Sequence, residues 1–304
     1  MNQGLIYYKI DNALDIYHES KYNDIMIVPS LNSYHYIKRL GGKAMALLHV
    51  NFFSDVLGKM TAMYVILPQK TSKQIGMNGA GTDGKYPVLY LLHGLSDDYT
   101  VWQRRTSIER YVAEMGIAVV MPDADTSFYS DMVYGRKYWT FLSQELPEII
   151  HEFFPNISQR REDNFVAGLS MGGYGAYKLA LGTDRFAAAA SLSGALDLPL
   201  EMTNEDRIDA NGDLWKNIFG DLSKVRDSIN DPMYLASELV KSGKPLPKLY
   251  MWCGTEDFIY DLSVSAHKKL DELGFDLTYE ESEGDHQWKY WDEKIQTVLK
   301  WLPY

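Results

Sequence analysis

A serine flanked by two glycines, in the pentapeptide Gly168-Leu-Ser170-Met-Gly172, is the best candidate of this chain for nucleophilic chemistry. The pentapeptide follows the apolar run Asn164-Phe-Val-Ala and precedes an Ala-rich stretch from Tyr174 to Leu181. This order predicts a sharp strand-to-helix turn, in which the glycines let neighbouring backbone approach closely. The pattern alone also arises by chance, so the interpretation rests on this context.

An acid and a histidine follow the serine in the order that nucleophilic catalysis requires. A serine hydroxyl needs a base and a group that orients the base, because it is a poor nucleophile at neutral pH. Asp257 closes the segment Gly-Thr-Glu-Asp after an apolar strand, and His286 stands one helix and one strand later. Among seven histidines, His286 has the required context and order. We expect Ser170 to attack an ester carbonyl, His286 to carry the proton and Asp257 to hold the imidazole. Glu256 is the alternative acid, although the shorter carboxylate suits the turn better.

Two backbone N–H groups are expected to stabilise the negative charge that develops on the attacked carbonyl. One belongs to Met171, at the start of the helix after the serine. The other belongs to Leu95, because Leu91-Leu-His93-Gly94-Leu95 ends an earlier apolar strand. The alternative for His93-Gly94 is an ordinary turn at the end of a strand.

Other reactive or aromatic side chains are weaker candidates. Cys253 ends an apolar strand without a histidine in the required order, so we interpret it as a buried, inert thiol. Trp102, Trp215 and Trp288 are candidates for substrate binding, as is Tyr99, but aromatic residues in so Tyr-rich a chain are more often core. No His, Cys and Asp grouping has the spacing of metal ligands, so we expect neither a metal nor a cofactor.

Composition narrows the class of protein and its partners. The chain has 304 residues, 46% of them apolar, which suffices for one large core, and its net charge of −11 disfavours nucleic acid and anionic membranes. One cysteine excludes an internal disulfide and fits a reducing compartment. No secretory signal or apolar run of about 18 residues is apparent. We expect a cytoplasmic protein that acts on a small molecule, and leave open whether it is a homo-oligomer.

Short apolar runs alternate with amphipathic stretches, which predicts an α/β fold with a mostly parallel, doubly wound sheet covered by helices on both faces. The expected strands are 47–53, 60–67, 87–92, 118–121, 164–168, 187–192, 248–253 and 276–281, with a Gly-rich turn over 76–85, and the expected helices are 106–115, 138–154, the helix after Ser170, 261–273 and 288–302.

Two segments stand apart from this alternation. Residues 1–44 are Tyr-rich and weakly periodic, and we interpret them as an extension, peripheral to a catalytic domain over 45–304 or foreign to it, with a second start at Met45. Residues 194–247 form a polar and aromatic insertion after the sixth core strand, which predicts a small cap over the site.

Four separated motifs resemble the esterase D family. They are Leu91-Leu-His-Gly-Leu-Ser-Asp-Asp98 with Trp102, Gly168-Leu-Ser-Met-Gly-Gly-Tyr-Gly175, Cys253-Gly-Thr-Glu-Asp-Phe258 and Gly284-Asp-His-Gln-Trp288. The chain is most similar to the bacterial tributyrin esterases, relatives of S-formylglutathione hydrolase, feruloyl esterases and mycolyltransferases. The resemblance, from about Met45 to the end, implies an α/β-hydrolase fold without cofactor that cleaves short-chain acyl esters. It also implies a triad of Ser170, Asp257 and His286, with Leu95 and Met171 as oxyanion donors.

One departure from the family bears on the substrate. S-formylglutathione hydrolases usually carry a cysteine in the loop after the first core strand, where this chain has Ser96-Asp97-Asp98. We therefore favour oxygen esters, including acetylated or feruloylated sugars. A thioesterase of the formylglutathione type is the first alternative, and a catalytically silent binding protein is the second.

Overall fold

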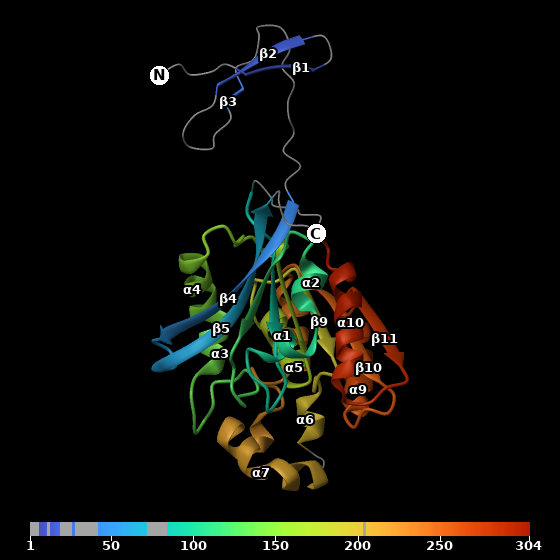
Figure 1. Cartoon of the computed structure of the whole chain (residues 1–304). Helices are drawn as coiled ribbons and strands as arrows, with labels where there is room; N and C mark the ends of the chain where they lie inside the picture. The colour runs from blue at the N-terminus through green and yellow to red at the C-terminus, as the bar shows by residue number, and fades with distance from the viewer. Residues whose placement is uncertain (1–5, 11–12, 19–25, 28–41, 72–83, 203–204) are drawn as a thin grey trace. The chain divides into compact units, whose positions relative to one another are not determined.

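The computed structural model describes residues 6–10, 13–18, 26–27, 42–71, 84–202 and 205–304 (Figure 1). The chain divides into two compact units, Met1–Leu40 and Gly41–Tyr304. In the first unit, β1 (Ile6–Ile10), β2 (Ala13–His18) and β3 (Met26–Ile27) form an antiparallel sheet. The expected boundary at residue 44 lies slightly later than this division, and the peripheral role of residues 1–44 stays a prediction. Most of the expected turn over 76–85 lies outside the described residues.

Within the described part of the second unit, an eight-stranded sheet has the order β11-β10-β9-β8-β6-β7-β5-β4. Its strands are β4 (Gly42–Ser54), β5 (Lys59–Thr71), β6 (Val88–Leu92), β7 (Ala118–Pro122), β8 (Asn164–Leu169), β9 (Ala188–Leu192), β10 (Lys248–Gly254) and β11 (Leu277–Ser282). Strands β6 to β11 are parallel, whereas β4 and β5 join as an antiparallel hairpin. All residues of β6, β7, β8 and β9 are buried, because helices cover both faces. The predicted α/β fold is confirmed.

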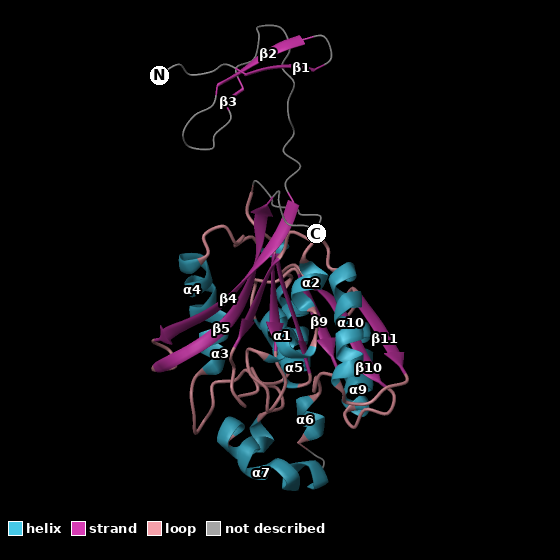
Figure 2. Ribbon diagram, in the orientation of Figure 1, coloured by secondary structure: helices cyan, strands magenta, loops and turns pink. Residues whose placement is uncertain are grey.

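The helices divide between the two faces of the sheet. They are α1 (Val101–Arg105), α2 (Ile108–Val112), α3 (Tyr138–Thr140), α4 (Leu146–Phe153), α5 (Met171–Gly182), α6 (Leu198–Glu201), α7 (Glu205–Phe219), α8 (Pro232–Ser242), α9 (Tyr260–Glu272) and α10 (Trp288–Trp301). One hydrophobic core holds residues of α1, α2 and α10, and the other holds residues of α3, α4, α5, α7, α8 and α9. Helices α2 and α10 contact each other on the first face (Figure 2).

The helix expected over 138–154 is interrupted by a π-helical turn, Phe141–Glu145. Glu145, at the end of this turn, accepts hydrogen bonds from the Ser54 hydroxyl and from the backbone N–H groups of Asp55 and Val56. These three groups belong to the turn of the β4–β5 hairpin. The interruption therefore places a carboxylate where the hairpin needs an acceptor, which a helical pattern in the sequence does not reveal.

The insertion over 194–247 supplies α6, α7, the 3₁₀ turn Leu222–Lys224 and α8. It leaves the sheet at the carboxyl end of β9, and Figure 1 shows α6 and α7 beyond that edge. Its helices contact the core, since α8 packs against α5 and α9, α6 contacts α9, and the N–H groups of Val133 and Tyr134 donate to carbonyls of α7. That the insertion caps the site stays a prediction. No helix in the described ranges has the length and apolar character needed to cross a membrane.

Candidate active site

Ser170 occupies a strained turn between β8 and α5. Its φ of 51° and ψ of −120° lie in a region that residues with a side chain rarely adopt. A Cβ atom at Gly168 would lie less than 3.0 Å from the backbone of Gly172, and one at Gly172 would meet the carbonyl oxygen of Leu92 as closely. The glycines are therefore required at both positions. The N–H of Ser170 donates to the carbonyl of Leu192 at 2.9 Å, which ties the turn to β9.

His286 joins the serine to an acid through hydrogen bonds at both ring nitrogens. Its Nε2 lies 2.9 Å from Oγ of Ser170, and its Nδ1 lies 2.9 Å from each carboxylate oxygen of Asp257. The Asp257 side chain is wholly buried and that of His286 is 19% exposed. Because Asp257 can only accept as a carboxylate, Nδ1 carries the proton and Nε2 is free to accept one from Ser170. The structure thus brings the three predicted side chains together.

Glu256, the alternative acid, serves a different group. Its carboxylate accepts from the N–H of Gly284 at 2.6 Å and from the Thr255 hydroxyl at 2.8 Å, and its own N–H donates to the Gly284 carbonyl at 3.0 Å. The hydrogen bond from Gly284, followed by that from Thr255, lowers the pKa of the Glu256 carboxyl. Glu256 therefore anchors the loop that carries His286, while Asp257 contacts the imidazole.

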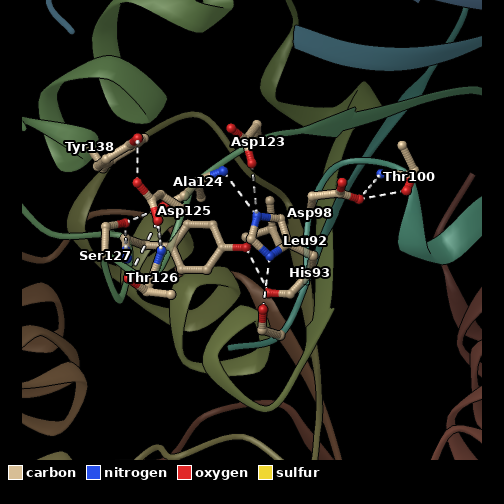
Figure 3. A network of polar contacts seen from close by, with 12 residues as sticks. Leu92, His93, Asp98, Thr100, Asp123, Ala124, Asp125, Thr126, Ser127 and Tyr138 are labelled. Atoms are coloured by element: carbon tan, nitrogen blue, oxygen red, sulfur yellow. Dashed lines mark hydrogen bonds and ion pairs between the residues drawn. The ribbon is translucent and has the colours of Figure 1, made fainter. Parts of the chain in front are cut away.

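The loop after β6 is held by hydrogen bonds from side chains to its carbonyl groups. The indole Nε1 of Trp102 donates to the carbonyl of Leu92 at 2.9 Å, and Nδ1 of His93 lies 2.9 Å from the carbonyl of Gly94. The Nε2 of His93 accepts from the N–H of Ala124 at 2.9 Å (Figure 3). Since that N–H can only donate, His93 carries its proton on Nδ1 and donates it to Gly94.

This contact of His93 determines the direction of one predicted oxyanion donor. In a trans peptide the C=O and the N–H point in opposite directions across the same plane. The carbonyl of Gly94, once fixed by His93, therefore fixes the N–H of Leu95. Met171 is the first residue of α5, and the N–H groups of a first turn have no acceptor inside the helix.

Comparison with known proteins identifies the family. The family described as "Putative esterase" matches residues 54–302. The chain belongs to this esterase family. An acetyl esterase of Caldicellulosiruptor saccharolyticus is 32% identical over 271 residues, which cover 85% of this chain and 98% of the relative.

Two solved structures from Staphylococcus aureus resemble this esterase over nearly their whole length. The fluorophosphonate-binding serine hydrolase F is 37% identical with a TM-score of 0.74, and covers 85% of this chain and 98% of its own. An S-formylglutathione hydrolase is 36% identical with a TM-score of 0.72, and covers 85% and 99%. The fold is that of the α/β-hydrolases, and the chain is a carboxylic ester hydrolase.

The predicted substrate-binding tryptophans occupy different environments in this esterase. Trp102 and Trp215 are only 1% and 3% exposed, so they lie in the core. Trp288 is partly buried and packs edge-to-face on Trp102 and on Trp291, which in turn contacts the His286 ring. A role for the three tryptophans in substrate binding stays a prediction.

Phe258 is a residue of the site that the sequence analysis did not single out. Its ring centroid lies 4.6 Å from that of His286, and the side chain is 61% exposed. Its position directly after the predicted acid was the signal in the sequence. The structure adds the exposure, and large apolar side chains on a surface often mark a binding site.

Neither the cysteine nor a metal cluster competes with Ser170 in the described structure. Cys253 is buried, and burial, with the nearby charge of Asp257, raises the pKa of its thiol to about 12. A thiol of such pKa stays protonated at neutral pH and is a poor nucleophile. Over the described ranges, no group of three or more His, Cys, Asp or Glu side chains is arranged to hold a metal ion.

Proposed function

We propose that this esterase hydrolyses short-chain acyl esters through an acyl-enzyme formed on Ser170. The observation that supports the mechanism best is the continuous hydrogen-bonded series from Asp257 through His286 to Ser170, with 2.9 Å at each step. That series is what a serine needs to act as a nucleophile at neutral pH.

In the proposed reaction, Oγ of Ser170 attacks the ester carbonyl carbon and its proton passes to Nε2 of His286. Asp257 stabilises the imidazolium that forms. The carbonyl oxygen, now negatively charged, accepts hydrogen bonds from the N–H groups of Leu95 and Met171, and the loss of one such donor costs about 3 kcal/mol. The tetrahedral intermediate expels the alkoxide, which takes the proton from His286 and leaves as the alcohol. Water then repeats the sequence on the acyl-enzyme and releases the acid.

The charge beside the nucleophile favours neutral oxygen esters. The Cβ position built on Gly94 lies 3.4 Å from a carboxylate oxygen of Asp97 and 3.7 Å from the Cβ of Ser170, so Asp97 stands next to the nucleophile. Asp98 follows it in the chain. S-formylglutathione carries carboxylates that the charge of Asp97 would repel. The acetyl esterase relative supports the same choice.

A thioesterase is the second candidate, because the S-formylglutathione hydrolase of Staphylococcus aureus is 36% identical. Turnover of p-nitrophenyl acetate, butyrate and octanoate, compared with that of S-formylglutathione, separates the two. We expect the acetate and butyrate esters to be the better substrates. Fast thioester turnover beside negligible ester turnover would reject the proposal.

A fluorophosphonate probe tests whether Ser170 is reactive at all. We expect stoichiometric labelling of Ser170 in the folded protein and no labelling after Ser170→Ala. An unlabelled wild-type protein would favour the silent binding protein. We further propose a small-molecule ester as the partner and a cytoplasmic location, the latter supported by the unpaired, buried thiol of Cys253.

A further inference from the structure

The loop after β7 contains three residues other than glycine with positive φ, namely Asp125, Phe128 and Tyr129, at 51°, 48° and 51°. Such conformations persist only where the surroundings impose them, and they gather at functional sites. Here the hydroxyl of Ser127 donates to the carbonyl of Ala124 at 2.6 Å and accepts from the N–H of Tyr129 at 3.1 Å. The side chain of Tyr129, at the end of this turn, has no solvent exposure.

Tyr129 lies between the helix of the nucleophile and the loop after β6. Its ring packs on Gly175 of α5, where an added Cβ atom would come within 3.0 Å of three ring atoms. Its hydroxyl donates to the carbonyl of His93 at 2.9 Å. One side chain therefore bridges the element that begins with Met171 and the loop that contains Leu95.

The bond from Tyr129 completes a series of three. The successive carbonyls of the loop accept from Trp102, from Tyr129 and from the imidazole of His93. The imidazole sets the direction of the Leu95 N–H, whereas Tyr129, which also packs on α5, sets the distance of the loop from the helix. A Cβ atom at Gly172 would meet the same carbonyls of Leu92 and His93, so loop and helix are in close contact here.

We propose that Tyr129 is a positioning residue of the oxyanion hole, which fixes the spacing between the N–H groups of Leu95 and Met171. The inference rests on the proposed function, because this spacing matters only if both groups bind the oxyanion. The spacing affects the transition state more than the bound substrate, because the two N–H groups are directed at the position of the oxyanion and not at that of the carbonyl oxygen in the ground state. Burial, with a smaller effect of the Asp123 charge, holds the pKa of the Tyr129 hydroxyl well above its usual value, which keeps it a donor.

Tyr129→Phe is the test, because it removes the hydroxyl and leaves the ring against Gly175. We expect kcat for p-nitrophenyl butyrate to fall about 10- to 100-fold with KM within about twofold, as for a small misplacement of a donor. Affinity for a trifluoromethyl ketone, whose adduct with the serine carries an oxyanion, falls in parallel. The pH profile keeps its shape, because the hydrogen bonds of His286 are unchanged.

Tyr177→Phe is the matched control. Tyr177 lies on α5, the helix against which Tyr129 packs, is as buried as Tyr129, and donates its hydroxyl to a backbone carbonyl, that of Tyr250, at 3.1 Å. The two variants should lose similar stability in urea, but Tyr177→Phe should keep kcat within about twofold, since its hydroxyl binds a carbonyl of β10 and not one of the loop after β6. Titration with a fluorophosphonate counts folded sites, so rates are expressed per reactive serine.

A kcat per titrated site that is unchanged in Tyr129→Phe, or reduced equally in Tyr177→Phe, would overturn the inference. Should Tyr129→Phe fail to fold, Gly175→Ala displaces the ring and retains the hydroxyl; the same selective loss of kcat is expected, and an unchanged kcat overturns the inference. Full activity of Ser170→Ala would instead defeat the proposed function.

Discussion

Glu256 and Gly284 form two reciprocal hydrogen bonds, since the N–H of each residue donates to an oxygen of the other, at 3.0 and 2.6 Å. A Cβ atom at Gly254 would collide with the backbone of Gly284, so the loops that carry the acid and the histidine are in direct contact. Adjacent carboxylates in the chain therefore have separate tasks. Asp257 holds the imidazole, and Glu256 holds the loop on which the imidazole stands.

This division predicts effects of very different size on kcat for two conservative substitutions. Asp257→Asn should lower kcat by about 10⁴-fold, because the amide stabilises the wrong imidazole tautomer. Glu256→Gln should lower kcat only a few-fold and reduce thermal stability slightly, since an exposed carboxylate is lost. Initial rates with p-nitrophenyl butyrate and melting by circular dichroism measure both. A wild-type rate in Asp257→Asn would transfer the orienting role to Glu256.

Ser170→Ala should abolish hydrolysis without unfolding the protein. The substitution removes Oγ, which contacts His286, and retains the Cβ atom that the turn already accommodates. Ser237→Ala is the control, because the Ser237 hydroxyl donates to the Met233 carbonyl within α8. Rates and urea midpoints are compared for both. Residual turnover above about 1% of wild type in Ser170→Ala would indicate another nucleophile.

Phe258 should contribute to substrate binding rather than to the chemical step. Its exposed ring lies against His286, so we expect Phe258→Ala to raise KM for p-nitrophenyl octanoate by about 3- to 10-fold, and less for the acetate. Phe153→Ala is the control, because it removes an exposed ring elsewhere, on α4. It should leave the KM values for the octanoate and the acetate unchanged. Equal KM changes for all acyl lengths would show that the ring does not contact the acyl chain.

Lys178 gives the stability of the protein a distinct pH dependence. It is wholly buried on α5, its Nζ lies 2.7 Å from both Ser130 Oγ and Asn230 Oδ1, and burial lowers its pKa from 10.5 to about 7. Between these pH values the unfolded chain holds a proton that the folded protein lacks. The free energy of unfolding therefore rises with pH across this window, by about 1.4 kcal/mol per unit, and this contribution is constant below it.

Lys178→Met removes that contribution, so the stability difference between variant and wild type should shift in favour of the wild type from pH 7 to pH 9. Urea unfolding of both proteins at pH 6, 7, 8 and 9 measures it. Parallel curves for the two proteins over the whole range would contradict a depressed pKa at Lys178.

The sequence predicts the strands of the sheet and the relative order of Ser170, Asp257 and His286, because buried parallel strands and an elbow between glycines have local signatures. It does not predict contacts that depend on distant partners. The hydrogen bond from the Trp102 indole to the carbonyl of Leu92 is one such contact. Tyr129 adopts a positive φ that its residue type disfavours, and its ring packs against Gly175 on a helix distant in the sequence. The carboxylate of Glu145, at the end of the π-helical turn, accepts a hydrogen bond from a hairpin 90 residues away in the sequence.

The insertion begins at Gly194, two residues after Leu192, whose carbonyl accepts the N–H of the nucleophile. The residues that join β9 to the insertion are hydrogen-bonded to the core. Ser193 donates its N–H to the carbonyl of Trp252 and accepts from the indole of Trp291, and the N–H of Leu196 donates to the carbonyl of Gly194. If the insertion is exchanged for that of a relative in order to change the substrate selectivity, the junction is best placed after Leu196. A junction at Ser193 would let the backbone of the new segment shift Leu192, and with it the position of the Ser170 Oγ.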